Sequence, residues 1–476
     1  MASTFRTTPG ESTTLPPGIP YIIGNEAAER FSFYGMKGIL VVYMTSYMLA
    51  GDGSPDQMGK EQANGVYHLF TAAAYFFPLL GAIIADAFWG KYRTILVLSM
   101  GYCIGHGLIA LGDIGLATTT VSPRVWLFMG MVFIAIGSGG IKPCVSAHVG
   151  DQFGSKNRHL ISRTFGWFYF SINVGAALSM VMAQPLLEHY GAWLAFGLPG
   201  VLMGIATFVF WLGRHHFVHI PPSGWAKFVS RTFNPDGRRA IRNLAPIFLI
   251  FIPVFWALFD QTGSSFIQQA KLLDLHFLGI DWYESQIQVA NPILILLLIP
   301  TFSYLVYPFL GRYFRVTPLR KIGAGLFLMV IAFSIPIWIE YQLLAGAKPS
   351  IGWQLVSYLL LTTAEVMVSI TALEFAYTQA PPAMKSLVMG IYLLGVSLGN
   401  LFTSGVNFLL DALKKEDGTT ILEGPNYFIF FTGLMLVAAI AFAIYARTYR
   451  GSTFIQGVGE VDNDDVDLAE QEPLQD

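Results

Sequence analysis

The sequence predicts an all-helical protein that crosses a membrane many times. Of its 476 residues, 54% are hydrophobic and 12% are charged, whereas a soluble domain usually carries about 25% charged residues. Twelve apolar stretches follow one another along the chain, and about 20 apolar residues are enough for a helix to span a bilayer. Lysine and arginine are distributed unevenly between the connections, which is typical of loops that alternate between two sides of a membrane.

The apolar content places the twelve stretches in order. They occupy approximately residues 19–49, 62–86, 92–115, 125–149, 164–187, 191–213, 244–271, 285–310, 318–345, 352–379, 384–411 and 426–448. If both termini are cytoplasmic, 19 of the 28 basic residues fall on the cytoplasmic side, six on the opposite side and three within spans. We therefore expect both ends of the chain in the cytoplasm.

A basic connection, residues 214–243, divides the stretches six and six. The two halves resemble each other weakly, because Gly90-Lys91-Tyr92-Arg93 and Gly311-Arg312-Tyr313-Phe314-Arg315 occur at the same inner turn of each half. Two six-helix bundles with a site between them are typical of the major facilitator fold. The predicted order is a cytoplasmic N-terminal segment, a first bundle, a linker, a second bundle and an acidic disordered cytoplasmic tail, at residues 1–18, 19–213, 214–243, 244–448 and 449–476.

The first stretch contains four charged residues, Glu26, Glu29, Arg30 and Lys37. At about 100° per residue these side chains gather on one stripe of a helix. A charge at the centre of a bilayer costs at least roughly 2.5–3.5 kcal/mol on insertion scales. The stripe therefore predicts a polar cavity in which the charges have partners. An amphipathic helix outside the membrane is the alternative, and the apolar run from Ile39 to Leu49 disfavours it.

Other spans also carry polar side chains that call for an explanation. Lys142 could pair with the acids of the first stretch or snorkel to the interface, and His68 could handle protons or simply be a satisfied core histidine. Asp260 and Glu365 favour a functional reading more strongly, because acids within spans usually face a cavity. Amides in apolar helices can bind a ligand or pack helices together, and both readings stay open for Asn173 and Asn291.

The acids and bases within the spans are nearly balanced, which favours pairing between them. A carboxylate that binds either a proton or an arginine is suited to coupling with a proton gradient. The chain has no His-Glu-x-x-His, Gly-x-Ser-x-Gly or phosphate-binding loop, so we expect no enzyme, and no metal or cofactor other than the proton. Composition gives no reason to expect nucleic acid as a partner.

These residues resemble the proton-dependent oligopeptide transporters of the major facilitator superfamily. The resemblance covers residues about 20–440. It rests on the first-helix motif Glu26-x-x-Glu29-Arg30-Phe31, on residues 81–94, on Phe168-Tyr169-x-x-Ile172-Asn173-x-Gly175, and on the run from Ala364 to Pro381.

The resemblance implies a role for each candidate residue. Lys37 and Arg30 would receive the carboxylate of a peptide, and Glu365 would hold its amino terminus together with Asn173 and Asn291. A proton-coupling set would consist of Glu26, Glu29, Arg30, His68, Lys142 and Asp260. The cavity would be lined by Tyr34, Tyr67 and Trp256.

The chain also departs from the family pattern. Lys37 and Phe33 stand where arginine and tyrosine are common, and these changes could alter peptide preference. The linker is too short to supply the two extra helices of many bacterial relatives. Residues 346–351 leave no room for the extracellular domain of the animal proteins. A compact member in the inner membrane of a bacterium is therefore expected.

The predicted function is proton-coupled symport of di- and tripeptides by alternating access, performed by a monomer within the lipid bilayer. Bound peptide would join a cationic first half to an acidic second half, which couples occupancy to movement of the halves. One alternative is a transporter of the same fold for nitrate, a glucoside or a peptide-like drug. Another is a receptor derived from a transporter.

Overall fold

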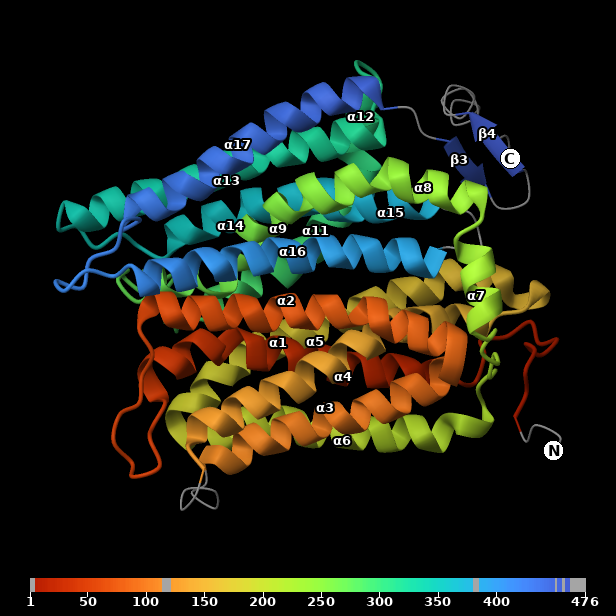
Figure 1. The fold of residues 1–476 in the computed structure, drawn as a ribbon, viewed down its shortest axis with the longest axis horizontal. Coiled ribbons are helices and arrows are strands. Elements are labelled where there is room, and N and C mark those ends of the chain that lie inside the picture. Colours follow the sequence, from red (N-terminus) through yellow and green to blue (C-terminus); the bar gives the residue numbers. More distant parts are fainter. Residues whose placement is uncertain (1–4, 114–120, 380–384, 450–451, 456–458, 463–476) are drawn as a thin grey trace.

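A computed structural model describes residues 5–113, 121–379, 385–449, 452–455 and 459–462. Nearly all long elements are helices, and they lie lengthwise beside one another (Figure 1). Helix α1 begins and helix α17 ends at the same end of the bundle, which we call the termini side. The other end, which carries the connection at residues 51–59 and the turn before α17, is called the far side (Figure 1).

The first six spans are nearly continuous helices. Short π-helical turns at Tyr43–Tyr47 and Ala85–Trp89 extend α1 and α2, and a 3₁₀ turn at Ser155–Leu160 precedes α5. The helices are α1 (Ile19–Val42), α2 (Lys60–Ile84), α3 (Lys91–Asp113), α4 (Pro123–Asp151), α5 (Ile161–Tyr190) and α6 (Ala192–Leu212).

Between the halves, helix α7 (Trp225–Thr232) runs across the termini side at a steep angle to the spans (Figure 1). The following helix, α8 (Pro235–Pro246), starts within the segment predicted as a linker. Its first turn is specified locally: the Asn234 side chain accepts a hydrogen bond from Gly237 N at 2.7 Å, and Pro235 occupies the first helical position.

Spans of the second half are more often broken. The seventh consists of α8, a π-helical turn at Ile247–Phe251, α9 and α10, and the tenth changes to a π-helical turn at Val366–Ile370. The helices are α9 (Ile252–Phe259), α10 (Ser265–Ala270), α11 (Ala290–Thr301), α12 (Tyr307–Gly311), α13 (Pro318–Leu344), α14 (Gly352–Glu365), α15 (Thr371–Thr378), α16 (Lys385–Ala412) and α17 (Pro425–Thr448).

Eleven helical segments in the described part of the chain are long and apolar enough to cross a membrane. The predicted first span is not among them, because its four charged side chains lower the hydropathy of α1. Even so, α1 with its π-helical turn is continuous from Ile19 to Tyr47. A charged helix of that length surrounded by apolar spans is the feature that makes the centre of this bundle polar.

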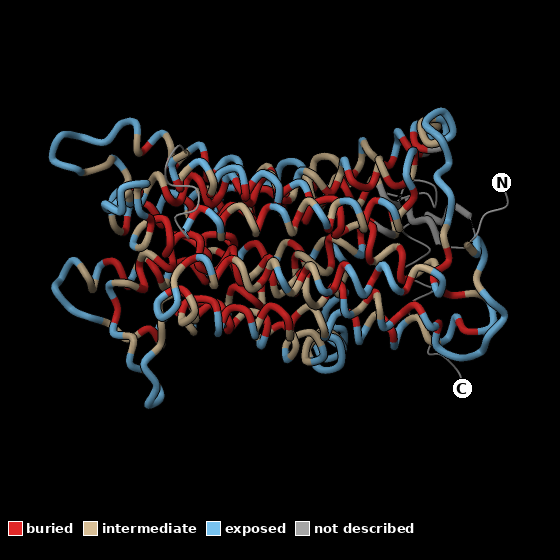
Figure 2. The backbone as a smooth tube through the Cα atoms, turned by 90° about the horizontal axis from the view of Figure 1, so that it is seen from below, coloured by how far each residue is buried: buried red, intermediate tan, exposed pale blue. Residues whose placement is uncertain are grey.

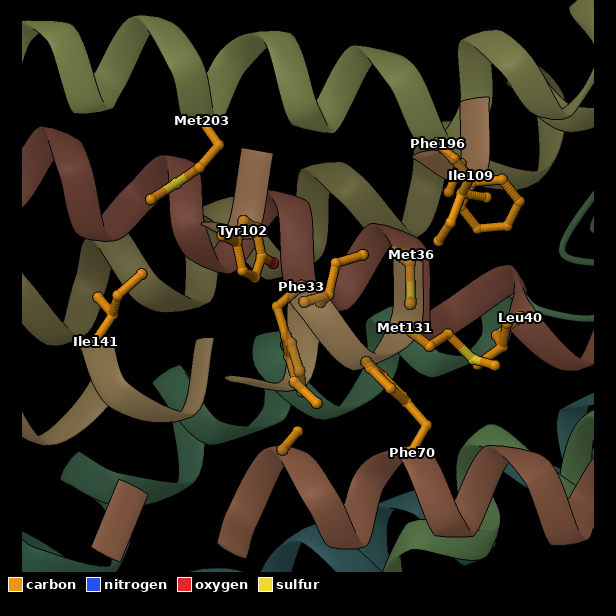
Figure 3. Close-up of a cluster of buried hydrophobic side chains, with 14 of the residues drawn as sticks. Phe33, Met36, Leu40, Phe70, Tyr102, Ile109, Met131, Ile141, Phe196 and Met203 are labelled. Carbon is orange, nitrogen blue, oxygen red and sulfur yellow. The ribbon is translucent and has the colours of Figure 1, made fainter. Parts of the chain in front are cut away.

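Each half has its own hydrophobic core. The first cluster of buried residues comes almost entirely from α1 to α6, and Figure 3 shows part of it, including Phe33, Phe70 and Phe196. The second cluster comes from the helices that follow the linker and includes Phe248 and Phe333. Buried backbone is concentrated in the interior along the length of the bundle, and the connections at both ends are exposed (Figure 2).

Small residues let the helices of the first half approach closely. A Cβ added to Gly81 would overlap Gly140 Cα, so α2 and α4 touch backbone to backbone at this point. In membranes, where water does not drive helices together, such contacts are a main source of packing energy. This contact fixes α4 beside α2, with Ser138 and Lys142 on the turns around it.

In the described residues, the strands lie between α10 and α11 and after α17. Strands β1 (His276–Phe277) and β2 (Ile280–Asp281) form an antiparallel pair between α10 and α11. Strands β3 (Ser452–Ile455) and β4 (Gly459–Asp462) form a second pair after α17, with Ser452 opposite Asp462. The rest of the predicted acidic tail, at residues 450–451, 456–458 and 463–476, lies outside the described residues.

Candidate functional site between the helix bundles

The seventh span breaks where it meets the first half. Helix α9 ends at Phe259, residues Asp260–Gly263 form a 3₁₀ turn, and α10 begins at Ser265. A Cβ on Gly263 would overlap the Tyr67 hydroxyl, so only glycine lets α2 approach the turn this closely. The break places the carboxylate of Asp260 opposite α1 rather than along a regular helix face.

Lys37 and Asp260 form a buried ion pair that joins the two halves. Lys37 Nζ lies 2.7 Å from Asp260 Oδ1, and the residues are 7% and 5% exposed. The other carboxylate oxygen accepts a hydrogen bond of 2.7 Å from Asn400 Nδ2 on α16. Removing one partner of a buried pair leaves an uncompensated charge, which costs about 3–5 kcal/mol. Each charge therefore depends on the other half of the molecule.

His68 is connected to this ion pair through Asn400. Its Nδ1 lies 2.8 Å from Asn400 Oδ1, and its Nε2 lies 2.8 Å from Ser264 Oγ. Because Asn400 donates its amide to Asp260, its Oδ1 is the acceptor, and His68 Nδ1 carries the proton of that bond. Lys37, Asp260, Asn400 and His68 thus form one polar network, which we call the interface network.

The acids near the start of α1 form a separate group. Arg30 Nε lies 2.7 Å from Glu26 Oε1 and 3.3 Å from Glu29 Oε2. Ser138 on α4 donates a hydrogen bond of 2.8 Å to Glu29 Oε1. Two buried carboxylates therefore share one guanidinium, and this acidic cluster, Glu26, Glu29 and Arg30, carries one excess negative charge when both acids are ionised.

Lys142 was predicted to belong to the acidic cluster. It lies close enough to interact electrostatically with both glutamates. Its ammonium group nevertheless makes no hydrogen bond or ion pair with any residue in the described part of the chain. It lies 3.6 Å from the centre of the Phe33 ring and 4.6 Å from that of Tyr75. Aromatic faces stabilise a desolvated cation by about 2 kcal/mol. Lys142 is therefore held by aromatic rings and not by direct contact with an acidic side chain of the described residues.

A third polar group lies within the second half. Asn291 Nδ2 on α11 donates to Glu365 Oε2 at 2.7 Å and to Thr362 Oγ1 at 3.2 Å. The predicted partner Asn173 is not part of this group, because its amide donates to the carbonyl of Tyr169 in its own helix at 2.9 Å. Glu365 therefore keeps one carboxylate oxygen without a described protein donor.

The predicted aromatic residues lie near these groups. The ring centre of Tyr67 is 5.3 Å from Lys37 Nζ, and Tyr34 packs edge-on against Phe33 at 5.5 Å. Trp256 packs against Phe259, with the ring centres 5.1 Å apart, and its Nε1 is buried. Tyr67 thus places an aromatic ring beside the cation of the interface network.

Polar contacts between the halves are concentrated toward the far side. They include the hydrogen bonds from Lys271 Nζ to Thr45 and Ser46, at 2.8 and 2.7 Å, and the one from Ser397 Oγ to Ala72 O at 2.8 Å. The two halves are therefore joined by direct polar contacts on the far side.

Comparison with known proteins identifies the chain. Residues 92–234 and 224–422 match the POT family. The chain belongs to the POT family. It is 34% identical to the POT family transporter PepTSo, covering 92% of this chain and 99% of that one with a TM-score of 0.78. A structure described as an auto inhibited POT family peptide transporter is 32% identical over 94% of this chain and 99% of its own, with a TM-score of 0.80.

Curated animal proteins are also similar. Peptide transporter family 1 of Drosophila melanogaster is 35% identical over 369 residues, which are 69% of this chain and 48% of that protein. Solute carrier family 15 member 2 of Homo sapiens is 32% identical over 76% of this chain and 54% of its own length. The chain thus spans about half the length of the curated relatives it matches. The predicted family and the predicted fold, an all-helical multi-pass membrane protein, are confirmed.

One polar element of the site in this POT family chain was missed by sequence reasoning, namely the polar face of α16. Ser397, Asn400 and Ser404 all face the first half, where Ser404 Oγ donates to Gly65 O at 2.8 Å. Their spacing of three and four residues puts them on one helix face. That spacing was visible in the apolar stretch 384–411 and could have indicated a polar helix contact.

Proposed function

We propose that this POT family member is a proton-coupled symporter that imports di- and tripeptides by alternating access. The relatives include proteins named as peptide transporters. The observation that carries the proposal is the ion pair between Lys37 and Asp260, which links the two halves across the site. The cation that would receive a peptide carboxylate is held by an acid of the opposite half.

A short peptide is a zwitterion, and the polar groups suit its two ends. Lys37 and Arg30 in the first half would receive the carboxylate. Glu365 with Asn291 in the second half would hold the ammonium group, with Asn173 contributing when its backbone contact opens. Tyr34, Tyr67 and Trp256 supply polarisable walls that accept different side chains. Recognising both ends but little else permits a broad range of peptides.

Proton binding would act by weakening the polar contacts that join the two halves. Protonation of Asp260 removes its charge and weakens the pair with Lys37, which frees the ammonium group for a peptide carboxylate. His68 is placed to pass the change on through Asn400. The acidic cluster can hold a second proton, because Glu26 and Glu29 compete for Arg30 while Lys142 stands nearby. Proton and peptide together then favour opening of the far side.

Orientation follows from the distribution of basic residues. We place residues 19–213 and 244–448 as two bodies that rock against each other in a bacterial inner membrane, with both termini cytoplasmic. The fastened far side is then the outer one, and the conformation is closed to the outside. A single chain contains both halves of the site, which supports a functional monomer.

Purified protein in proteoliposomes tests the proposal. Labelled dialanine should accumulate when an inward proton gradient is imposed, and a protonophore should abolish the accumulation. Intact protein that shows no gradient-dependent uptake of dialanine or trialanine would refute peptide symport. Uptake that excess nitrate or a glucoside, but not peptide, competes away would assign another substrate. Glu365→Gln should reduce uptake by about tenfold or more, since a charge-assisted hydrogen bond to the ammonium group is lost.

A further inference from the structure

A polar cavity lies within the second half, apart from the site between the halves. It has a volume of about 570 Å³ and lies among α11, α12, α13 and α15 on the termini side, a size typical of small-molecule sites. No residue from Phe302 to Gly311 is buried, so the eighth span stands away from its neighbours here. The cavity is lined by Ile299, Ser303, Tyr307, Pro308, Lys321, Val366, Ile370, Thr371 and Glu374.

Two opposite charges face this cavity without neutralising each other. Lys321 comes from α13 and Glu374 from α15, and neither forms a hydrogen bond or ion pair with another described residue. Lys321 Nζ lies 4.3 Å from the centre of the Tyr307 ring. The Tyr307 hydroxyl is buried and interacts with the side chain of Thr371, which also lines the cavity. A cation, an anion and two hydroxyls therefore surround one space, and these groups suit a zwitterionic ligand.

The position of the cavity determines what kind of zwitterion can reach it. Lys321 lies in the first turn of α13, beside Arg315 and Arg320, where a lipid headgroup would meet a membrane-spanning helix. The outer surface of the eighth span is strongly apolar, because Leu305 is 67% exposed and Phe309 is 56% exposed. Within the cavity the wall includes Ile299, Val366 and Ile370. The ligand should thus combine a charged head with a hydrocarbon chain.

We propose that this cavity binds the headgroup of a phospholipid with a primary ammonium group, as in phosphatidylethanolamine. The phosphate is bound by Lys321 and the Tyr307 hydroxyl, and the ammonium group is bound by Glu374. An acyl chain follows the apolar surface around Leu305. A choline headgroup has no N–H donor for the carboxylate, and a headgroup with only negative charge would face Glu374. The site should therefore distinguish headgroups rather than bind any lipid.

Native mass spectrometry of the purified full chain in detergent, titrated with dilauroyl phosphatidylethanolamine or dilauroyl phosphatidylcholine, tests the proposal. For the first lipid molecule bound, the wild type should bind the ethanolamine lipid about tenfold more tightly than the choline lipid. Glu374→Gln should remove that preference by weakening only ethanolamine binding. Lys321→Gln should weaken both lipids, because both carry the phosphate.

Glu423→Gln and Lys348→Gln make the same chemical changes at exposed far-side positions, and they should leave both affinities unchanged. Equal binding of the two lipids by the wild type, or equal loss in the test and control variants, would overturn the proposal. Dialanine provides a further arm, because a peptide is also a zwitterion. If millimolar dialanine displaces the ethanolamine lipid in the wild type but not in Glu374→Gln, the cavity is a peptide site and the lipid proposal fails.

Discussion

The interface network and the acidic cluster are both buried groups of charge, but they are built differently. The cluster draws both acids and its arginine from a single helix, at spacings of three and four residues, so it can form within the first half alone. The network pairs Lys37 with an acid 223 residues away and exists only when the halves touch. Charge in the cluster can change without moving the halves, whereas charge in the network cannot.

Because of this difference, we expect the interface network and the acidic cluster to have different roles in transport. The network fastens the far side, so its state is coupled directly to which side of the bundle is open. The cluster has an excess acid and an unpaired lysine beside it, so it can take up a proton at little structural cost. If the proposed symport is correct, the network acts as the gate and the cluster as a proton reservoir. Variants that separate stability from transport can test this distinction.

The largest effect is expected at the ion pair of the network. Lys37→Gln and Asp260→Asn should each reduce proton-driven dialanine uptake by more than about tenfold, and each should lower the thermal stability, because a buried charge loses its partner at a cost of about 3–5 kcal/mol. The double variant should be more stable than the sum of the two losses predicts. Thermal unfolding in detergent measures the stability of all four proteins. Additive losses would show that the pair does not fasten the halves.

The acidic cluster should respond asymmetrically to charge removal. Arg30→Gln leaves two buried acids without their shared guanidinium, so we expect a loss of about 3–5 kcal/mol. Glu26→Gln leaves the contact between Arg30 and Glu29 and the hydrogen bond from Ser138 in place. We therefore expect a loss of only about 1–2 kcal/mol, measured as the change in Tm. A larger loss for Glu26→Gln than for Arg30→Gln would contradict the excess-acid interpretation.

These charges illustrate what sequence can predict. The four charged residues of α1 stand out because charge is rare in apolar stretches, and helical spacing alone brings Arg30 to Glu26. The pair of Lys37 with Asp260 depends on a break in the seventh span and on how two bundles dock, and neither is encoded in a local pattern. Sequence reasoning named both residues and expected acids and bases of the spans to pair, but it did not single out this pair.

Uncharged polar residues were harder to interpret. Asn400 looks like any amide that packs helices, and its role between His68 and Asp260 becomes visible only from its two contacts. The predicted linker, residues 214–243, carries a local signal of its own. Asn234-Pro235 is a good helix start, and α8 begins there.

A moderate effect is expected for the amide of the network. Asn400→Leu leaves Asp260 Oδ2 and His68 Nδ1 without their partner, and each unsatisfied buried group costs about 1–3 kcal/mol. We expect uptake to fall about threefold to tenfold, less than for loss of the ion pair. Asn407→Leu is a matched control on the same face of α16, because Asn407 bonds to Tyr427 within the second half. Equal loss of uptake in both variants would mean that Asn400 acts only in packing.

The smallest effect is expected where the halves meet in solvent. Lys414 Nζ and Glu61 Oε2 lie 3.1 Å apart on the far side, but their side chains are 35% and 15% exposed. Exposed pairs contribute about 0–1 kcal/mol and are screened by salt. Lys414→Gln should therefore change uptake by less than about twofold, with the difference vanishing in high salt. A loss as large as that of Lys37→Gln would mean that any contact between the halves limits transport. The expected contrast would show instead that burial is what lets the interface network control opening of the far side.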